Sequence, residues 1–255
     1  MSNKKLFSLT TIINWCSYYF FLTLKAKFHI IYEEEIIMKI LVYNPTTNRM
    51  ETYYRELNEP MPYSKDRYLT VKEFKGSSNS DVLWTDRRTI EAFNKLRELY
   101  GKPIPVGYGF KRIREGGHSA MSQHYAGVAL DVGQKLNNEE RSKLRKLATN
   151  YKLYTYVEPE SLTPTWVHID TRAKNPACAR GGYPTIRQGS KGVYVATLQD
   201  ALDFLGYNVG NIDGIFGTNT KNAVINYQKS KGLKADGIVG CNTWTALTRE
   251  VADKR

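Results

Sequence analysis

The chain has 255 residues, of which 41% are hydrophobic, and it carries a formal net charge of +12. This length is enough for two small domains. The excess of basic residues favours anionic partners, but these residues are spread widely and form no recognisable nucleic-acid-binding pattern. The three cysteines lack the spacing of a metal site, and free thiols at Cys178 and Cys241 are a simpler expectation than a disulfide between them.

The first 37 residues allow two interpretations. Residues 6–24 are largely apolar after a short basic start, which is typical of a membrane anchor or a signal peptide. The anchor is favoured, because no cleavage site stands out. Alternatively, translation starts at Met38, because the codons of the glutamates at 33–35 can serve as a purine-rich ribosome-binding site. A membrane partner is expected only if residues 6–24 are a real anchor.

Residues 38–67 predict an N-terminal extension that contains a β-hairpin. Its alternating run over residues 39–55 is interrupted by the turn-forming residues 44–48. The pattern assigns no function to this hairpin.

Residues 68–172 predict an α+β domain in which helices flank a small antiparallel sheet. One helix is expected over residues 86–100, ended by Gly101, and a second over residues 138–150, capped by Asn137. Helical spacing predicts that the following side chains point inward: Ile90, Phe93, Leu96, Tyr100, Leu144, Leu147 and Tyr151.

The segment at residues 122–131 offers two metal ligands, His124 and Asp131, and His168 offers a third. On a continuous helix, His124 and Asp131 would lie about 10 Å apart along the axis, too far to share one ion. The chain must therefore bend between them, and Gly127 permits the bend. Two imidazoles and one carboxylate leave zinc an open fourth position, which is the ligand count of a catalytic site.

Residues 128–132 and 166–172 alternate apolar with polar side chains, so each segment predicts a half-buried strand. Antiparallel pairing of the two strands would bring Asp131 and His168 together. His124 would then reach the same point from the turn.

The pattern Ser-x-His-x-x-Gly-x-Ala-x-Asp begins at Ser122 and is followed downstream by an aromatic-x-His strand. It resembles the zinc D-Ala-D-Ala carboxypeptidases and their murein endopeptidase relatives, in the superfamily that includes lysostaphin and the hedgehog amino-terminal domain. The resemblance covers roughly residues 68–180. It implies one Zn²⁺ per chain, held by His124, Asp131 and His168, and a substrate among the stem peptides of peptidoglycan.

The general base remains open between Asp170 and Glu158. Several members of the superfamily have an acidic residue three positions before the last histidine, where this chain has Thr165. Others use a second histidine two residues after the ligand, where this chain has Asp170, about 6.6 Å along the strand. Glu158 competes from the preceding loop, and Asp170 could instead pair with Arg172 or orient a ligand histidine.

Carboxypeptidases of this kind need a cation for the terminal carboxylate of the substrate. Relatives have a Ser-Gly-Tyr-Arg strand end for it, whereas this chain has only Lys111 or Arg112 to substitute. This departure leaves cleavage within the stem or cross-bridge open. Ser122 and Arg172 are the other expected substrate-binding residues, and His118 is expected to be a solvated loop residue.

Residues 173–184 predict a tethering linker, because they are rich in chain breakers and poor in apolar side chains. Residues 185–250 then carry an internal repeat, in which an Asp-Gly turn precedes a helix start at residues 213–220 and again at 236–243. This region resembles the three-helix peptidoglycan-binding domain of many wall hydrolases over nearly its full length. The resemblance implies a small all-α domain that binds and does not catalyse.

Together, the two resemblances predict a zinc peptidase of peptidoglycan, either a D,D-carboxypeptidase or a murein endopeptidase, from a bacterium or an endolysin-like phage enzyme. One alternative is a non-catalytic wall-binding protein whose peptidase domain is degenerate, and another is a structural component that only adheres. We expect a monomer at the cell wall or outside the cell, or in the cytoplasm until lysis if a phage enzyme starts at Met38. Anionic wall polymers suit its charge better than nucleic acid does.

Overall fold

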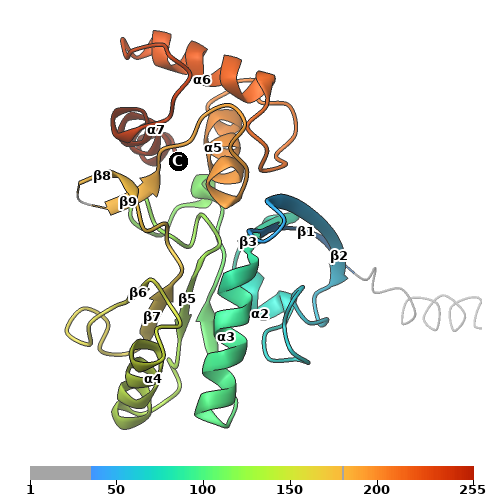
Figure 1. The fold of residues 1–255 in the computed structure, drawn as a ribbon, viewed down its shortest axis with the longest axis vertical. Coiled ribbons are helices and arrows are strands. Elements are labelled where there is room, and N and C mark those ends of the chain that lie inside the picture. The colour runs from blue at the N-terminus through green and yellow to red at the C-terminus, as the bar shows by residue number, and fades with distance from the viewer. Residues whose placement is uncertain (1–35, 180) are drawn as a thin grey trace, which may run out of the picture. The chain divides into compact units, whose positions relative to one another are not determined.

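The computed structural model describes residues 36–179 and 181–255 (Figure 1). Residues 37–255 form one compact unit of mixed α+β structure. The expected anchor at residues 6–24 lies outside the described residues. Among the residues that are described, no helix is long and apolar enough to cross a membrane.

The unit contains three small sheets, whose strand orders are β2-β1-β3, β4-β5-β7-β6 and β8-β9. In chain order its elements are β1 (Ile37–Asn44), β2 (Arg49–Glu56), α2 (Val71–Lys75), β3 (Val82–Asp86), α3 (Arg87–Tyr100), β4 (Val106–Tyr108), the 3₁₀ turn η1 (Ile113–Glu115), β5 (Ala129–Val132), α4 (Asn138–Asn150), β6 (Tyr156–Val157), β7 (Val167–Asp170), β8 (Pro176–Cys178), β9 (Gly181–Pro184), α5 (Val193–Phe204), α6 (Thr218–Ser230) and α7 (Cys241–Lys254).

The predicted N-terminal hairpin is present as β1 and β2, which pair antiparallel. Strand β3 then joins β1 in parallel, with Trp84 beside Leu41. The side chains of Ile40 and Val42 are fully buried in the core that β3 also contributes to. The hairpin is therefore part of this domain's core and does not project from it as an extension.

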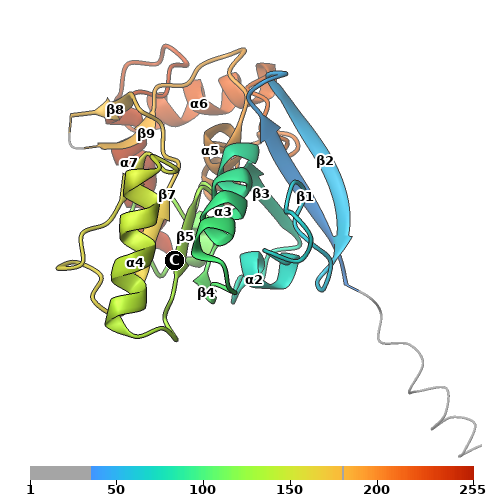
Figure 2. The same cartoon turned by 60° about the horizontal axis from the view of Figure 1, so that its bottom comes forward.

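Helices α3 and α4 pack on each other beside the second sheet (Figures 1 and 2). The second helix begins at its predicted cap, because Asn137 forms a capping box with Glu140. The first is capped by Asp86, which was predicted as its first residue and whose side chain accepts a hydrogen bond from the N–H of Arg88. The predicted inward side chains of α3 are all buried. On α4, Leu144 is buried, but the prediction for Tyr151 is wrong, because its side chain lies past the helix end and is 56% exposed.

The second sheet pairs β5 with β7 antiparallel and sets Asp131 opposite His168, the register that the alternation of side chains predicts. The segment before β5 is attached to β3 of the other sheet. Trp84 Nε1 donates to the carbonyl of Tyr125 at 2.9 Å, and Thr85 Oγ1 donates to the carbonyl of Gly127 at 2.8 Å. These two bonds fix the loop that carries the first predicted ligand.

Gly127 is the bend of this loop, with a φ of +66°, and a Cβ added there would lie 1.9 Å from the carbonyl oxygen of Trp84. We expect Gly127→Ala to lower the free energy of unfolding by more than about 3 kcal/mol, since it combines left-handed strain with a backbone clash. Gly101→Ala is the matched control, because its φ is +80° but nothing lies within 4 Å of the added Cβ. It should cost only about 1–2 kcal/mol. Urea denaturation measures both, and equal losses would contradict the clash.

Helices α5, α6 and α7 form the C-terminal helical domain, which Figure 1 shows grouped together. Two glutamines explain the internal repeat, because each one holds one of the repeated Asp-Gly turns. Gln199 Oε1 accepts from the N–H groups of Asp213 and Gly214, and its Nε2 donates to the Asp213 carboxylate. Gln228 makes the corresponding bonds to the N–H of Gly237 and to the Asp236 carboxylate. Each Asp-Gly turn is thus held by a glutamine of the preceding helix.

The segment predicted as a linker, residues 173–184, is folded. It contains the hairpin β8-β9, and Tyr183 on β9 is fully buried against Trp244 of α7, with ring centroids 5.0 Å apart. A disulfide joins Cys178 of β8 to Cys241 of α7, so the expectation of two free thiols is wrong. The hairpin is packed between the two domains. Composition alone does not distinguish a packed hairpin rich in glycine and proline from a flexible tether.

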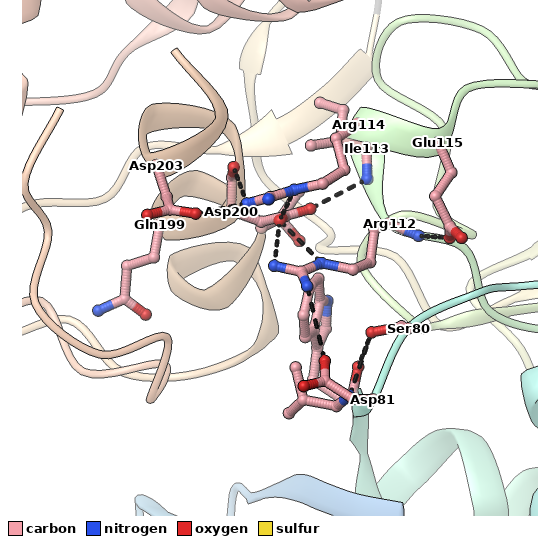
Figure 3. Close-up of polar contacts among 12 residues, drawn as sticks. Ser80, Asp81, Arg112, Ile113, Arg114, Glu115, Gln199, Asp200 and Asp203 are labelled. Carbon is pink, nitrogen blue, oxygen red and sulfur yellow. Dashed lines mark hydrogen bonds and ion pairs between the residues drawn. The ribbon is translucent and has the colours of Figure 1, made fainter. Parts of the chain in front are cut away.

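A buried ion cluster also joins the two domains (Figure 3). Asp200 of α5 is fully buried, and its carboxylate accepts hydrogen bonds from the guanidinium groups of Arg112 and Arg114 at 2.9 and 2.8 Å. Its second oxygen accepts from the N–H of Ile113 at 3.2 Å. Arg114 also reaches Asp203 on the next turn of α5 at 2.6 Å. The segment around η1 is therefore clamped onto α5.

We expect Asp200→Asn to lower the free energy of unfolding by about 3–5 kcal/mol, because it removes the buried carboxylate that Arg112 and Arg114 share and leaves Arg114 only its exposed partner Asp203. Asp203→Asn is the control, since that carboxylate is 49% exposed and should contribute less than about 1 kcal/mol. Thermal and denaturant unfolding would measure both variants. A loss at Asp200 no greater than that at Asp203 would mean that the cluster does not hold the domains together.

Candidate metal centre

The three predicted ligands come together in the structure. Single ligand atoms of His124, Asp131 and His168 lie within 4.8 Å of one another, and no other described group of histidine, cysteine or carboxylate side chains meets this criterion. Asp131 and His168 face each other across the pairing of β5 with β7, and His124 approaches from the loop before Gly127.

His124 is oriented by its neighbours. Its Nδ1 lies 2.7 Å from the carbonyl oxygen of Gly109, which can only accept, so Nδ1 carries the proton. The Nε2 atom therefore presents a lone pair. It is buried without a hydrogen-bond partner among the described residues, and Asp131 Oδ1 lies 3.4 Å from it. A buried nitrogen lone pair without a donor indicates that something is missing from its environment.

His168 lies between two carboxylates. Its Nδ1 is 2.8 Å from Asp131 Oδ1, and its Nε2 is 3.1 Å from Asp170 Oδ2. Burial alone would lower the pKa of His168, but these two carboxylates raise it to about 9. Burial would likewise raise the pKa of Asp131, yet His124 and His168 hold it far below its usual range. The cluster thus favours a positive charge beside Asp131.

This donor set fits zinc. It offers two imidazole nitrogens and one carboxylate oxygen, which is the protein ligand set of many catalytic zinc sites. The unpaired Nε2 of His124 and the preference for positive charge beside Asp131 are both met by a cation at the meeting point. Each ligand histidine also has an outer partner, the Gly109 carbonyl or the Asp170 carboxylate, as metal-bound histidines generally do.

A pocket of about 630 Å³ opens onto the three candidate ligands. Its described lining includes two residues predicted to bind substrate, Ser122 and Arg172, and one predicted base, Glu158. Lys111 and Arg112, predicted to bind a substrate carboxylate, do not line it. Arg112 is instead committed to Asp200, with only 13% of its side chain exposed. Among the described lining residues, Arg172 is therefore the only arginine or lysine.

The two predicted bases lie in different environments. Asp170 is fully buried and does not line the pocket, because its carboxylate accepts from His168 and from the backbone N–H and guanidinium of Arg172. Burial would raise the pKa of Asp170, but these partners keep it below its usual value. Its geometry corresponds to the alternative considered from the sequence, a residue that orients His168. Glu158 lines the pocket, and its N–H donates to the His168 carbonyl at 2.9 Å.

The loop that carries Glu158 is held by Arg145 of α4. This guanidinium is almost fully buried and donates to the carbonyl oxygens of Thr163 and Trp166. Thr165, at the position where relatives have an acid, is exposed and does not line the pocket. A buried arginine thus defines the shape of the loop beside the candidate ligands.

His118 was expected to be solvated, and this expectation is wrong. Its ring stacks on that of His124, with centroids 4.5 Å apart, and its Nε2 is buried without a hydrogen-bond partner among the described residues. Burial and the neighbouring His124 lower the pKa of His118 to about 4, so it is neutral at physiological pH. Tyr125 holds it in place, because the Tyr125 hydroxyl bonds to both the N–H and the carbonyl of His118. The sequence signal was the pair Gly116-Gly117, which allows the loop to fold back.

Residues 191–247 match a protein family described as "Putative peptidoglycan binding domain". The matched segment contains α5, α6 and the first half of α7, together with both Asp-Gly turns. It lies entirely after the candidate metal ligands in the sequence.

Curated relatives and solved structures match the chain over similarly short lengths. The N-acetylmuramoyl-L-alanine amidase CwlM of Mycobacterium tuberculosis is 51% identical over 53 residues, which are 21% of this chain and 13% of that protein. The spore cortex-lytic enzyme of Bacillus cereus is 38% identical over 64 residues, or 25% of each chain. The structure of a peptidoglycan-binding protein from Clostridioides difficile is 51% identical and covers 26% of this chain and 42% of that one, with a TM-score of 0.26.

The chain thus spans at most a quarter of the two curated enzymes. Through residues 191–247 it carries a domain of the peptidoglycan-binding family and is homologous to proteins named as cell-wall lytic enzymes.

Proposed function

We propose that this protein is a zinc-dependent peptidase that cleaves the peptide stems or cross-bridges of peptidoglycan, with its helical domain bound to the same polymer. The observation that carries the proposal is the convergence of His124, Asp131 and His168 at a pocket, with the Nε2 of His124 buried and unpaired. The peptidoglycan-binding domain at residues 191–247 supports the choice of substrate.

The residues of the chain have separate roles in this proposal. His124, Asp131 and His168 would hold one Zn²⁺, which supplies Lewis-acid polarisation of the scissile carbonyl when bound. The Gly109 carbonyl keeps the proton of His124 on Nδ1, and Asp170 keeps His168 turned toward Asp131. These contacts preorganise the ligand set before any ion or substrate arrives.

Glu158 is the general base in the proposal. It is the carboxylate in the described lining of the pocket that is not itself a candidate ligand. A carboxylate in this position can take a proton from the attacking water and deliver it to the leaving amine. Asp170 is unsuited to this role, because it is shielded from the pocket by its bonds to His168 and Arg172.

Endopeptidase cleavage is favoured over carboxypeptidase cleavage. An exopeptidase must bind the free carboxylate at the end of its substrate, for which arginine is the usual partner. In the described lining of the pocket the only such group is Arg172, which is already paired with Asp170. A substrate without a terminal charge near the scissile bond suits this pocket better. The cell wall or the extracellular space is where such an enzyme would act.

We expect the purified wild-type protein to retain about one Zn²⁺ per chain after dialysis, and His124→Ala and His168→Ala to retain almost none. Asp170→Asn should bind zinc about 10–100-fold more weakly, because the charged partner of His168 becomes a neutral amide. His118→Ala is the control, since His118 stacks on His124 without belonging to the ligand set, and it should keep its zinc. Elemental analysis gives the stoichiometry. Zinc-free wild-type protein would refute the metal site.

We expect Glu158→Gln to reduce turnover of purified sacculi by about 10²–10⁴-fold while zinc content and sacculus binding stay unchanged. Glu160→Gln is the matched control, because this neighbouring carboxylate is 51% exposed and does not line the pocket. New amino termini and product masses from a defined muropeptide measure the rates. Full activity of Glu158→Gln would rule out this base. A wild-type protein that binds zinc and sacculi but releases no product would favour the alternative of a non-catalytic wall protein.

A further inference from the structure

The pocket beside the candidate metal ligands is built from two domains. One side belongs to the α+β domain and carries Glu158, Trp166 and Arg172. The other side belongs to the hairpin β8-β9, through Ala179 and Gly182, and to α7, through Thr245. The disulfided pair Cys178 and Cys241 also lines this second side. We call the side formed by the hairpin and α7 the C-terminal wall.

The C-terminal wall is fixed against the metal-ligand loop. The Tyr183 hydroxyl donates to the carbonyl of Ser122 at 2.8 Å, two residues before His124. Tyr194 of α5 donates to Gln123 Oε1 at 3.0 Å. The disulfide ties β8 to the start of α7, and Trp244 Nε1 donates to the Pro184 carbonyl at 2.8 Å. These contacts come from the hairpin, α5 and α7, so all three elements have fixed positions relative to the candidate ligands.

The ion cluster of Asp200 provides a second attachment, which joins α5 to the segment around η1 (Figure 3). Attachments at the hairpin, at η1 and along α5 therefore hold the helical domain against the pocket. A domain that served only as a tether would need none of them.

The chemistry of the two sides differs. The α+β side presents an acid, an indole and a guanidinium, which can contact a peptide backbone and its polar groups. The described C-terminal wall presents only small or uncharged groups, such as Ala179, Gly182 and the exposed hydroxyl of Thr245. A pocket of about 630 Å³ is far larger than an ion requires, and the small size of these wall residues leaves the space open.

We infer that the C-terminal wall is part of the substrate site, where Ala179, Gly182 and Thr245 contact the bound peptide stem. The helical domain then has two functions, binding the wall polymer and shaping the pocket in which a peptide is held. This inference rests on the proposed function, because it names the substrate-contacting surface of the same site.

The test fills the pocket from the C-terminal wall. Thr245→Trp places a large side chain at an exposed helix position, so folding should be unaffected. Arg249→Trp is the matched control, one helical turn further along α7, 82% exposed and outside the pocket. Both variants and the wild type are loaded with zinc and titrated with a soluble muropeptide dimer. Zinc content and binding to intact sacculi are measured alongside.

We expect Thr245→Trp to weaken muropeptide binding and to raise KM by about tenfold or more, with kcat changed far less. Zinc content and sacculus binding should equal those of the wild type, and Arg249→Trp should match the wild type throughout. Equal muropeptide affinity for Thr245→Trp and wild type would overturn the inference. If the affinities differ but no protein releases product, the C-terminal wall stands and the proposed hydrolysis fails.

Discussion

The pairing of β5 with β7 is the constraint on which the candidate centre depends. It sets Asp131 opposite His168, and the loop before β5 brings His124 to the same point because Gly127 turns tightly against the Trp84 carbonyl. A shift of one strand by one residue would send its ligand to the opposite face of the sheet, away from the ligand on the other strand. The hydrogen bonds from β3 to this loop fix the position of His124 relative to the two strand ligands.

Local sequence patterns were sufficient for much of this architecture. The cap at Asn137, the helix end at Gly101 and the alternation around Asp131 and His168 each act over a few residues, and the structure has the helices and the strand pairing that they predict. The bend at Gly127 was predicted because His124 and Asp131 would be too far apart on a continuous helix to bind one ion. The helical domain was recognisable from its repeated turns, because each turn requires its own glycine and aspartate.

The sequence failed where a residue's partner lies far along the chain. Arg112 was read as a substrate cation, but its partner Asp200 is 88 residues away and lies in the other domain. Cys178 and Cys241 are 63 residues apart, and nothing local signals their pairing. His118 is a different case, because its partners His124 and Tyr125 are near in sequence but its burial depends on how the loop folds over His124. Such contacts are set by tertiary packing, which spacing within a motif does not encode.

The buried position of Asp200 makes the helical domain of this chain dependent on the α+β domain. A chimera that joined α5 to an unrelated catalytic domain would leave the Asp200 carboxylate without its partners Arg112 and Arg114. Conversely, the α+β domain without the helical domain would expose the guanidinium groups of Arg112 and Arg114, and the hairpin β8-β9 would lose its disulfide to α7. The helical domain is thus expected to lose stability when it is transferred without the segment around η1.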